Sequence, residues 1–201
     1  YEFQGLGEEG LKLLSKAREE TGLPIVTELL SQDHAELVAD YADMLQIGTR
    51  NAQNFQLIIA AAKTGKPVLL KRGMSMRIME WLLAGEYVLA NQNSNLLFCE
   101  RGVRTFEDYT RNTLDLSAVA VVKNESHCPI VVDPSQGCGK ASLVRAMCKG
   151  AVAMGADALI VEVHPDPTHA ISDAAQQIDL EGFNELMKEL VPIAESVGRE
   201  M

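Results

Sequence analysis

The stretch PVLLKRG, residues 67–73, is a short apolar run that ends in the charged residues Lys71 and Arg72. Its apolar residues are consecutive, which is typical of a strand buried on both faces of a parallel sheet. Five other runs in the chain have the same character. The expected strands cover residues 24–30, 44–48, 67–72, 96–101, 129–135 and 158–164.

Longer amphipathic stretches separate these runs, and they predict helices. An opening helix is expected over residues 8–20, and the last helix is expected to begin at Asp179, a residue type that caps helix N-termini. Apolar residues at helical spacing mark both a helix after Ser75 and the last helix. They are Ile78, Trp81, Leu82, Gly85 and Leu89 in the former, and Phe183, Leu186, Met187 and Leu190 in the latter.

The order is therefore one helix followed by six βα units, which predicts an α/β fold with a parallel sheet. Nearly every strand ends in polar residues, which favours a (β/α)8 TIM barrel, where all carboxyl ends meet at one site, over an open sheet. The nearest match to a phosphate-binding glycine fingerprint, GCG at 137–139, is incomplete. A whole barrel has about 250 residues, so we expect a single partial barrel over residues 1–201. It would carry about the last six βα units and lack the first two.

Composition narrows the class of protein. Hydrophobic residues make up 47% and charged residues 23%, as in globular proteins, and no apolar run is long enough to span a membrane. A formal net charge of -10 argues against general nucleic-acid binding. The four cysteines form no C-x-x-C pair, and no secretory signal is present. We therefore expect a cytoplasmic protein that is bound neither to membranes nor to nucleic acid.

Three cations, Arg50, Lys71 and Arg101, close three successive expected strands. In a barrel their side chains would converge on one pocket. A small phosphorylated or carboxylated substrate would compensate them, since guanidinium groups offer such oxygens a planar fork. The alternative is that each cation pairs with a strand-end carboxylate such as Glu28 or Glu100.

Two carboxylates, Glu162 and Asp173, lie on the last expected strand and in the loop after it. They could hold a divalent cation or transfer protons, or they could serve as an ion-pair partner and a helix cap. His164 is a candidate ligand or base, and equally a residue that anchors its loop. Cys138 is noted because it stands two residues after Gln136, at a strand end.

Taken together, several motifs resemble those of the 3-deoxy-D-arabino-heptulosonate 7-phosphate (DAHP) synthases. The similarity covers essentially the whole chain and is to the short type I form, which is related to the 3-deoxy-D-manno-octulosonate 8-phosphate (KDO8P) synthases. The motifs are FQGLG (3–7), QIGTRN (46–51), PVLLKRG (67–73), CERGVRTFE (99–107), RNTLD (111–115) and VEVHPDP (161–167).

The resemblance implies a barrel enzyme that condenses phosphoenolpyruvate with erythrose 4-phosphate, the entry to the shikimate pathway and aromatic amino acid biosynthesis. It implies that Arg50 and Arg101 hold the phosphoenolpyruvate phosphate. Lys71 would reach the carboxylate and the bridging oxygen, and Glu28 would position a water near the enol carbon. The catalytic residues would thus be Lys71, Glu28 and Arg101. Substrate binding would involve Arg50, Lys71, Arg101, Gln46 and Thr49.

The resemblance also implies a divalent metal, Mn2+, Zn2+ or Fe2+, which would polarise the aldehyde oxygen for attack by the enol carbon. Glu162 and Asp173 match two of the family's metal ligands. The cysteine ligand belongs to a first strand that this sequence does not contain, and Gln136 stands where the family has a histidine. A carboxamide binds transition metals more weakly than imidazole does, so we expect a weakened metal site.

Two alternatives remain beside a DAHP synthase. One is a non-catalytic homologue that binds phosphoenolpyruvate or a sugar phosphate through the phosphate clamp but has a degenerate metal site. The other is a KDO8P synthase, against which the run of residues 104–115 stands. A homo-oligomer, dimer or tetramer, is expected in each case.

Overall fold

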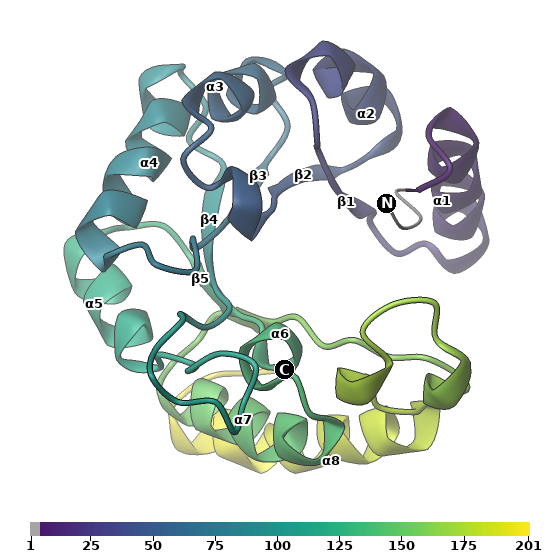
Figure 1. Cartoon of the computed structure of the whole chain (residues 1–201), viewed down its shortest axis with the longest axis vertical. Coiled ribbons are helices and arrows are strands. Elements are labelled where there is room, and N and C mark those ends of the chain that lie inside the picture. Colours follow the sequence, from purple (N-terminus) through teal and green to yellow (C-terminus); the bar gives the residue numbers. More distant parts are fainter. Residues whose placement is uncertain (1–4) are drawn as a thin grey trace. The chain divides into compact units, whose positions relative to one another are not determined.

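The computed structural model describes residues 5–201 (Figure 1). The chain forms two compact units: the first comprises the chain up to Gly73 together with Glu80–Leu97, and the second comprises Met74–Met79 and Phe98–Met201. The motif at 3–7 lies partly outside the described residues. Within the described part of the chain, none of the helices is long and apolar enough to cross a membrane.

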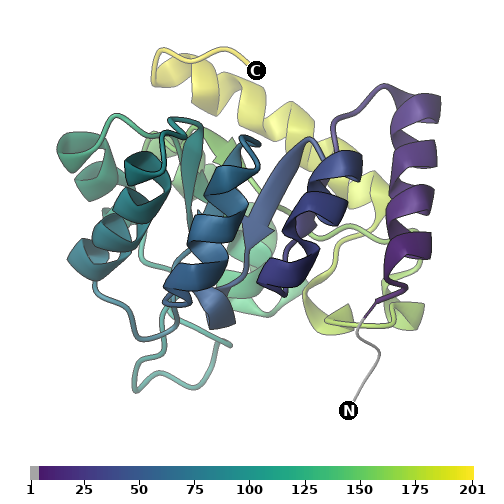
Figure 2. The ribbon, with the colours of Figure 1, turned by 90° about the horizontal axis from the view of Figure 1, so that it is seen from above.

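The first unit consists of parallel strands alternating with helices. Strand β1 pairs with β2 so that Glu28 lies opposite Gln46, and β2 pairs with β3 so that Gln46 lies opposite Leu69. Helices α2 and α3 both pack against β2, and they lie side by side in Figures 1 and 2. The elements are α1 (Glu8–Thr21), β1 (Val26–Glu28), α2 (Ala35–Tyr41), β2 (Met44–Ile47), α3 (Phe55–Lys63), β3 (Val68–Lys71) and most of α4 (Ile78–Ala90).

The second unit repeats this pattern. Strand β4 pairs in parallel with β5, and β5 pairs in parallel with β6, again in chain order. The elements are β4 (Leu96–Glu100), which begins in the first unit, α5 (Ser117–Glu125), β5 (Ile130–Val132), α6 (Pro134–Cys138), α7 (Ala141–Ala153), β6 (Ala158–Leu159) and α8 (Leu180–Ser196).

All six expected strands exist, but each is shorter than predicted, and at some of the ends a polar residue leaves the ladder to begin a cap. Asp133, for example, ends the predicted strand 129–135 by capping α6, where its side chain accepts from the amide of Gln136 at 2.9 Å. The expected start of the last helix is confirmed: the Asp179 side chain accepts from the amide of Gly182 at 2.7 Å.

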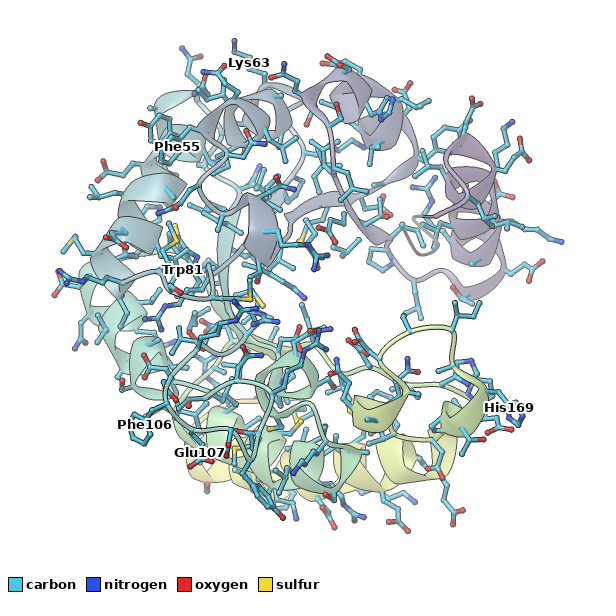
Figure 3. All side chains as sticks on the ribbon, viewed as in Figure 1. Phe55, Lys63, Trp81, Phe106, Glu107 and His169 are labelled. Carbon is cyan, nitrogen blue, oxygen red and sulfur yellow. The ribbon has the colours of Figure 1, made fainter. Side chains whose placement is uncertain are left out.

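The buried stripe of α4 differs from the predicted one. It consists of Trp81, Ala84, Gly85 and Val88. Trp81 is fully buried and its indole N–H donates to the carbonyl of Leu70 at 3.1 Å, which fixes the helix to β3. Figure 3 shows Trp81 on the ribbon, together with Phe106 on the surface of the loop between β4 and α5.

Helices α7 and α8 hold the second unit together. Their contact is an apolar seam lined by a charged edge. Arg145 on α7 contacts Glu189 on α8 with two nitrogens and Glu185 with a third at 3.0 Å, and Lys149 reaches Glu189 at 2.7 Å. The seam is formed by Val144, Cys148, Val152, Leu186, Leu190 and Ala194.

Residues 111–114 form a loop that rests on the glycine-rich turn 137–139. The amides of Arg111 and Asn112 donate to the carbonyls of Cys138 and Gly137 at 3.0 and 3.2 Å. A Cβ atom on Gly139 would collide with the Cβ of Arg111, and one on Gly137 would lie 2.7 Å from the Leu114 side chain. The glycines that resemble part of a phosphate-binding fingerprint therefore allow the loop that carries Arg111 to pack closely against residues 137–139.

We expect Glu189→Gln to lower the free energy of unfolding at neutral pH, because hydrogen bonds from Arg145 and Lys149 hold the pKa of Glu189 at about 2, below its ordinary value of 4.5. A depressed carboxyl pKa stabilises the fold above the unfolded-state pKa, and that contribution disappears as pH falls through the folded-state pKa. In denaturant titrations, the difference in the free energy of unfolding between wild type and variant should shrink as the pH falls from 4.5 toward 2. A gap that is independent of pH would contradict the assignment.

We expect Gly139→Ala to destabilise the protein more than Gly155→Ala does. Both glycines have positive φ, 68° and 95°, but only at Gly139 is the space for a Cβ occupied. Overpacking of this kind costs roughly 1–3 kcal/mol beyond the backbone strain that both variants share. Urea unfolding of the two variants measures the difference. Equal losses would mean that the Arg111 loop does not depend on close approach to Gly139.

Candidate functional site

The predicted substrate-binding residues of the first unit all lie at the carboxyl ends of its parallel strands. Parallel pairing brings these ends to one edge of the sheet. The hydroxyl of Thr49 donates to the carbonyl of Arg72 at 3.0 Å, which ties the end of β2 to the end of β3. Glu28 ends β1, Gln46 lies in β2, Thr49 and Arg50 form the short 3-10 turn Thr49–Asn51, and Lys71 ends β3.

Glu28 lies directly against the backbone of Gly48. A Cβ atom at position 48 would overlap the Glu28 carboxylate. Gly48 has an ordinary φ of -68°, so the position needs glycine for space and not for backbone conformation. Any side chain at position 48 would therefore displace the carboxylate that the family resemblance places near the enol carbon.

Arg101 follows the last residue of β4 in the second unit and is only 5% exposed. Its guanidinium donates to the carbonyl of Gly102 at 3.3 Å and to Oε1 of Gln136 at 3.2 Å, which are both neutral oxygens. The Glu100 carboxylate instead accepts from the amide of Gly102 at 2.6 Å. Burial lowers the pKa of Arg101, but a guanidinium stays protonated at any physiological pH. Arg101 is thus a buried cation without a carboxylate hydrogen-bond partner in the described second unit.

Gln136 connects Arg101 to both predicted metal-binding carboxylates. It lies in α6, and its Nε2 donates to Oε1 of Glu162 at 2.6 Å and to Oδ2 of Asp173 at 3.0 Å. The structure therefore brings Arg101, Gln136, Glu162 and Asp173 together, as expected for residues of one site. With Oε1 facing a guanidinium and Nε2 facing two carboxylates, the direction of the amide is fixed by its partners.

Arg111 and Gln176 complete a closed ring of side chains. Nη1 of Arg111 donates to Oδ1 of Asp173 at 2.7 Å and to Oε1 of Gln176 at 2.9 Å. Nε2 of Gln176 then donates to Oε1 of Glu162 at 2.8 Å. We call the five side chains of Arg111, Gln136, Glu162, Asp173 and Gln176 the amide ring.

No sequence pattern marked Arg111 or Gln176 as a site residue. Arg111 stands in the quoted motif at 111–115, so a role for that motif could have been sought. Gln176 lies in the 3-10 turn Ala174–Gln176 and belongs to none of the quoted motifs. Only its burial, at 2% exposure, marks it in the structure.

The two carboxylates of the ring differ in their pKa shifts. Burial raises the pKa of Glu162, and hydrogen bonds from Gln136 and Gln176 oppose the rise. Burial acts in the same direction on Asp173, but hydrogen bonds from Gln136 and Arg111 outweigh it and lower the pKa. Asp173 also has a left-handed backbone, with φ 51°, a conformation that is uncommon outside glycine and that clusters at functional sites.

The residues assigned to the metal by resemblance do not fit a cation as they are arranged. A carboxamide nitrogen carries two protons and no free donor pair, yet it is this atom of Gln136 that lies between the two carboxylates. Across residues 5–201, no three His, Cys, Asp or Glu side chains are grouped to hold a metal ion. DAHP synthases generally use a divalent metal, so the arrangement in this chain departs from the family.

His164 and Cys138, the two other candidates from the sequence, have contacts and burial that fit a structural role. Nδ1 of His164 accepts from the amide of Asp166 at 3.0 Å, which agrees with the loop-anchoring alternative. Cys138 is buried, and burial raises its pKa to about 11, so it stays a protonated thiol at neutral pH. A thiol in that state is a poor nucleophile.

The convergence of the three cations stays a prediction. Arg50 and Lys71 belong to the first unit and Arg101 belongs to the second.

Comparisons with known proteins agree with the motifs. The chain is 50% identical over 198 residues to a phospho-2-dehydro-3-deoxyheptonate aldolase of Thermotoga maritima, covering 98% of this chain and 59% of that protein. It is 34% identical to a 2-dehydro-3-deoxyphosphooctonate aldolase of Syntrophotalea carbinolica, covering 95% of this chain and 72% of the relative. The chain thus spans 59% of the length of the first relative.

Solved structures give the same result. A crystal structure of the Thermotoga maritima aldolase (DAHP synthase) superposes with a TM-score of 0.97 at 50% identity, over 100% of this chain and 59% of that one. A truncated 3-deoxy-D-arabino-heptulosonate 7-phosphate synthase from Thermotoga maritima gives 0.95 at 49% identity, over 98% and 75%. These likenesses support the predicted fold class, part of a TIM barrel. The sequence model of the DAHP synthetase I family matches residues 1–196, and this chain belongs to that family.

Proposed function

We propose that this chain is part of a DAHP synthase, which condenses phosphoenolpyruvate with erythrose 4-phosphate. The observation that carries the proposal is that Arg101 is buried and its guanidinium is hydrogen-bonded to neutral oxygens only. Arg101 lies within the family motif at 99–107. A buried cation of this kind is stabilised by an anion that accepts from its remaining N–H groups. The phosphate of phosphoenolpyruvate supplies such an anion.

The other substrate contacts of the proposal come from the first unit. Arg50 shares the phosphate with Arg101, and Lys71 binds the carboxylate and the bridging oxygen. Gln46 and Thr49 line the same strand ends. Cations fixed on strand ends hold the enol in one orientation, which lowers the entropic part of the barrier.

In the proposed reaction, the enol carbon forms a carbon–carbon bond with the aldehyde carbon, and positive charge develops at C2 of the former phosphoenolpyruvate. Glu28, seated over Gly48, orients a water molecule toward that carbon. The water oxygen adds to C2, and one of its protons goes to the former aldehyde oxygen, which becomes a hydroxyl. The bond between C2 and the bridging oxygen then breaks, the phosphate leaves with the bridging oxygen and the second water proton, and C2 becomes a ketone. One phosphoenolpyruvate, one erythrose 4-phosphate and one water thus give one DAHP and one phosphate.

The proposed reaction uses no Mn2+, Zn2+ or Fe2+, because Gln136, Glu162 and Asp173 do not fit a metal ion as they are arranged. Three further parts of the proposal rest on the sequence and the family likeness. The six βα units are the last six of the barrel, the protein is cytoplasmic, and it forms a homo-oligomer.

We expect the protein at its natural length to consume phosphoenolpyruvate with erythrose 4-phosphate and to release one phosphate per turnover. The measurement follows phosphate release and identifies the sugar product by mass spectrometry. Arabinose 5-phosphate serves as the matched aldose. Faster turnover with arabinose 5-phosphate would indicate a KDO8P synthase. Binding of phosphoenolpyruvate without turnover on either aldose would support the non-catalytic alternative.

We expect Arg101→Ala to weaken phosphoenolpyruvate binding by roughly 1.5–3 kcal/mol, or about 10–150-fold in Kd, because a charge-assisted contact is lost in a buried site. Calorimetry measures the affinity, and circular dichroism confirms that the variant folds. Arg145→Ala is the control, since Arg145 lies on the charged edge of α7 and α8. Unchanged affinity in Arg101→Ala would place the phosphate elsewhere.

A further inference from the structure

Hydrogen-bond donors and the Arg111 guanidinium hold the two carboxylates of the amide ring without a metal ion. Glu162 and Asp173 contribute two negative charges, and the Arg111 guanidinium contributes one positive charge. Arg111 contacts Asp173 directly at 2.7 Å, and Arg101 acts through Oε1 of Gln136. Two neighbouring carboxylates normally repel one another unless a cation or hydrogen-bond donors separate them. Here donors from Gln136 and Gln176 occupy that place.

We infer that the carboxamide of Gln136, together with Arg111, holds Glu162 and Asp173 in place of a divalent cation, so that this half of the site is organised without a metal. Both N–H groups of the amide have a carboxylate acceptor, and its oxygen accepts from Arg101. Both donor positions of the Gln136 side chain are therefore used within the ring.

Binding a metal through Gln136 would require the amide to turn over. The turn would bring Oε1 against two carboxylates and Nε2 against the guanidinium of Arg101, and three hydrogen bonds would be lost together. A metal would also have to compete with Arg111 for Asp173, which already accepts at Oδ1 from Arg111 and at Oδ2 from Gln136. The free energy of metal binding must therefore offset the loss of these hydrogen bonds.

The surrounding backbone holds the ring in this state. The amide of Gln136 donates to the Asp133 side chain, and the amide of Glu162 donates to the hydroxyl of Ser135 at 3.0 Å. Asn112 adds a bond from Nδ2 to the carbonyl of Gln136 at 2.9 Å. Preorganised partners of this kind make it costly to rearrange the side chains that they orient.

The test is a metal titration on the protein at its natural length, without substrate, so its result does not depend on the proposed reaction. We expect wild type purified without added metal to contain far less than one equivalent, and its Tm to respond neither to Mn2+ nor to a chelator. Gln136→Glu keeps the side-chain size but places a third carboxylate in the ring. This variant should have a lowered Tm that Mn2+ restores, and Gln136→His should bind Mn2+ at least about tenfold more tightly than wild type.

Arg111→Met supplies a second, independent variant. Loss of the guanidinium leaves Asp173 without its compensating charge, so the Tm should fall and Mn2+ should restore part of it. Arg145→Met is the matched control, because Arg145 also contacts two carboxylates but lies outside the ring, on the exposed edge of α7. Its Tm should not respond to Mn2+. Gln56→Glu, an exposed change on α3, controls for the added charge of Gln136→Glu.

Saturable binding of one Mn2+ by wild type, with a rise in Tm equal to that of Gln136→Glu, would overturn the inference. Equal Mn2+ affinities of wild type, Gln136→His and Gln136→Glu would overturn it as well. If Gln136→Glu does not fold, the comparison of wild type, Gln136→His and Arg111→Met still decides the question. Activity assays stand apart: a metal-dependent active enzyme would refute this inference alone, and a metal-free inactive protein would refute only the proposed reaction.

Discussion

Parallel strand pairing is the constraint on which the candidate site depends. In each unit, neighbouring strands run in the same direction, so their carboxyl ends lie at one edge of the sheet. Residues that end or follow these strands can then meet although they are far apart in sequence. Glu28 and Gln46 are opposed in the first unit in this way. Arg101 and Gln136 are hydrogen-bonded in the second unit.

Glycines determine how closely the functional side chains can approach. Gly48 gives space to the Glu28 carboxylate, and the turn 137–139 gives space to the loop that carries Arg111. An added Cβ at Gly48 would move the Glu28 carboxylate, the functional end of that side chain, and one at Gly139 would meet the Cβ of Arg111, which cannot move without its backbone. These glycines are therefore part of how the site is positioned.

Charge compensation in the second unit explains why this chain can differ from its family. A pair of carboxylates needs a counter-charge or donors, and a divalent metal is only one way to supply them. Gln136 donates to both carboxylates, Arg111 donates to Asp173, and Gln176 donates to Glu162. The amide nitrogen of Gln136 carries two protons and donates one to each carboxylate. Each imidazole nitrogen carries at most one proton, so a histidine at position 136 could not donate to both carboxylates through one nitrogen. The glutamine thus suits a ring of hydrogen bonds better than it suits a metal.

The sequence by itself determined the alternation of strands and helices, the helix cap at Asp179 and the family, because apolar runs, capping residues and motifs are local properties of the chain. It also placed Glu162, Asp173 and Gln136 in one candidate site. Only the tertiary structure decided which way the Gln136 amide faces, since its partners come from separate loops. Arg111 entered the site for the same reason: its partners Asp173 and Gln176 lie 62 and 65 residues away, a separation at which no local pattern predicts a contact.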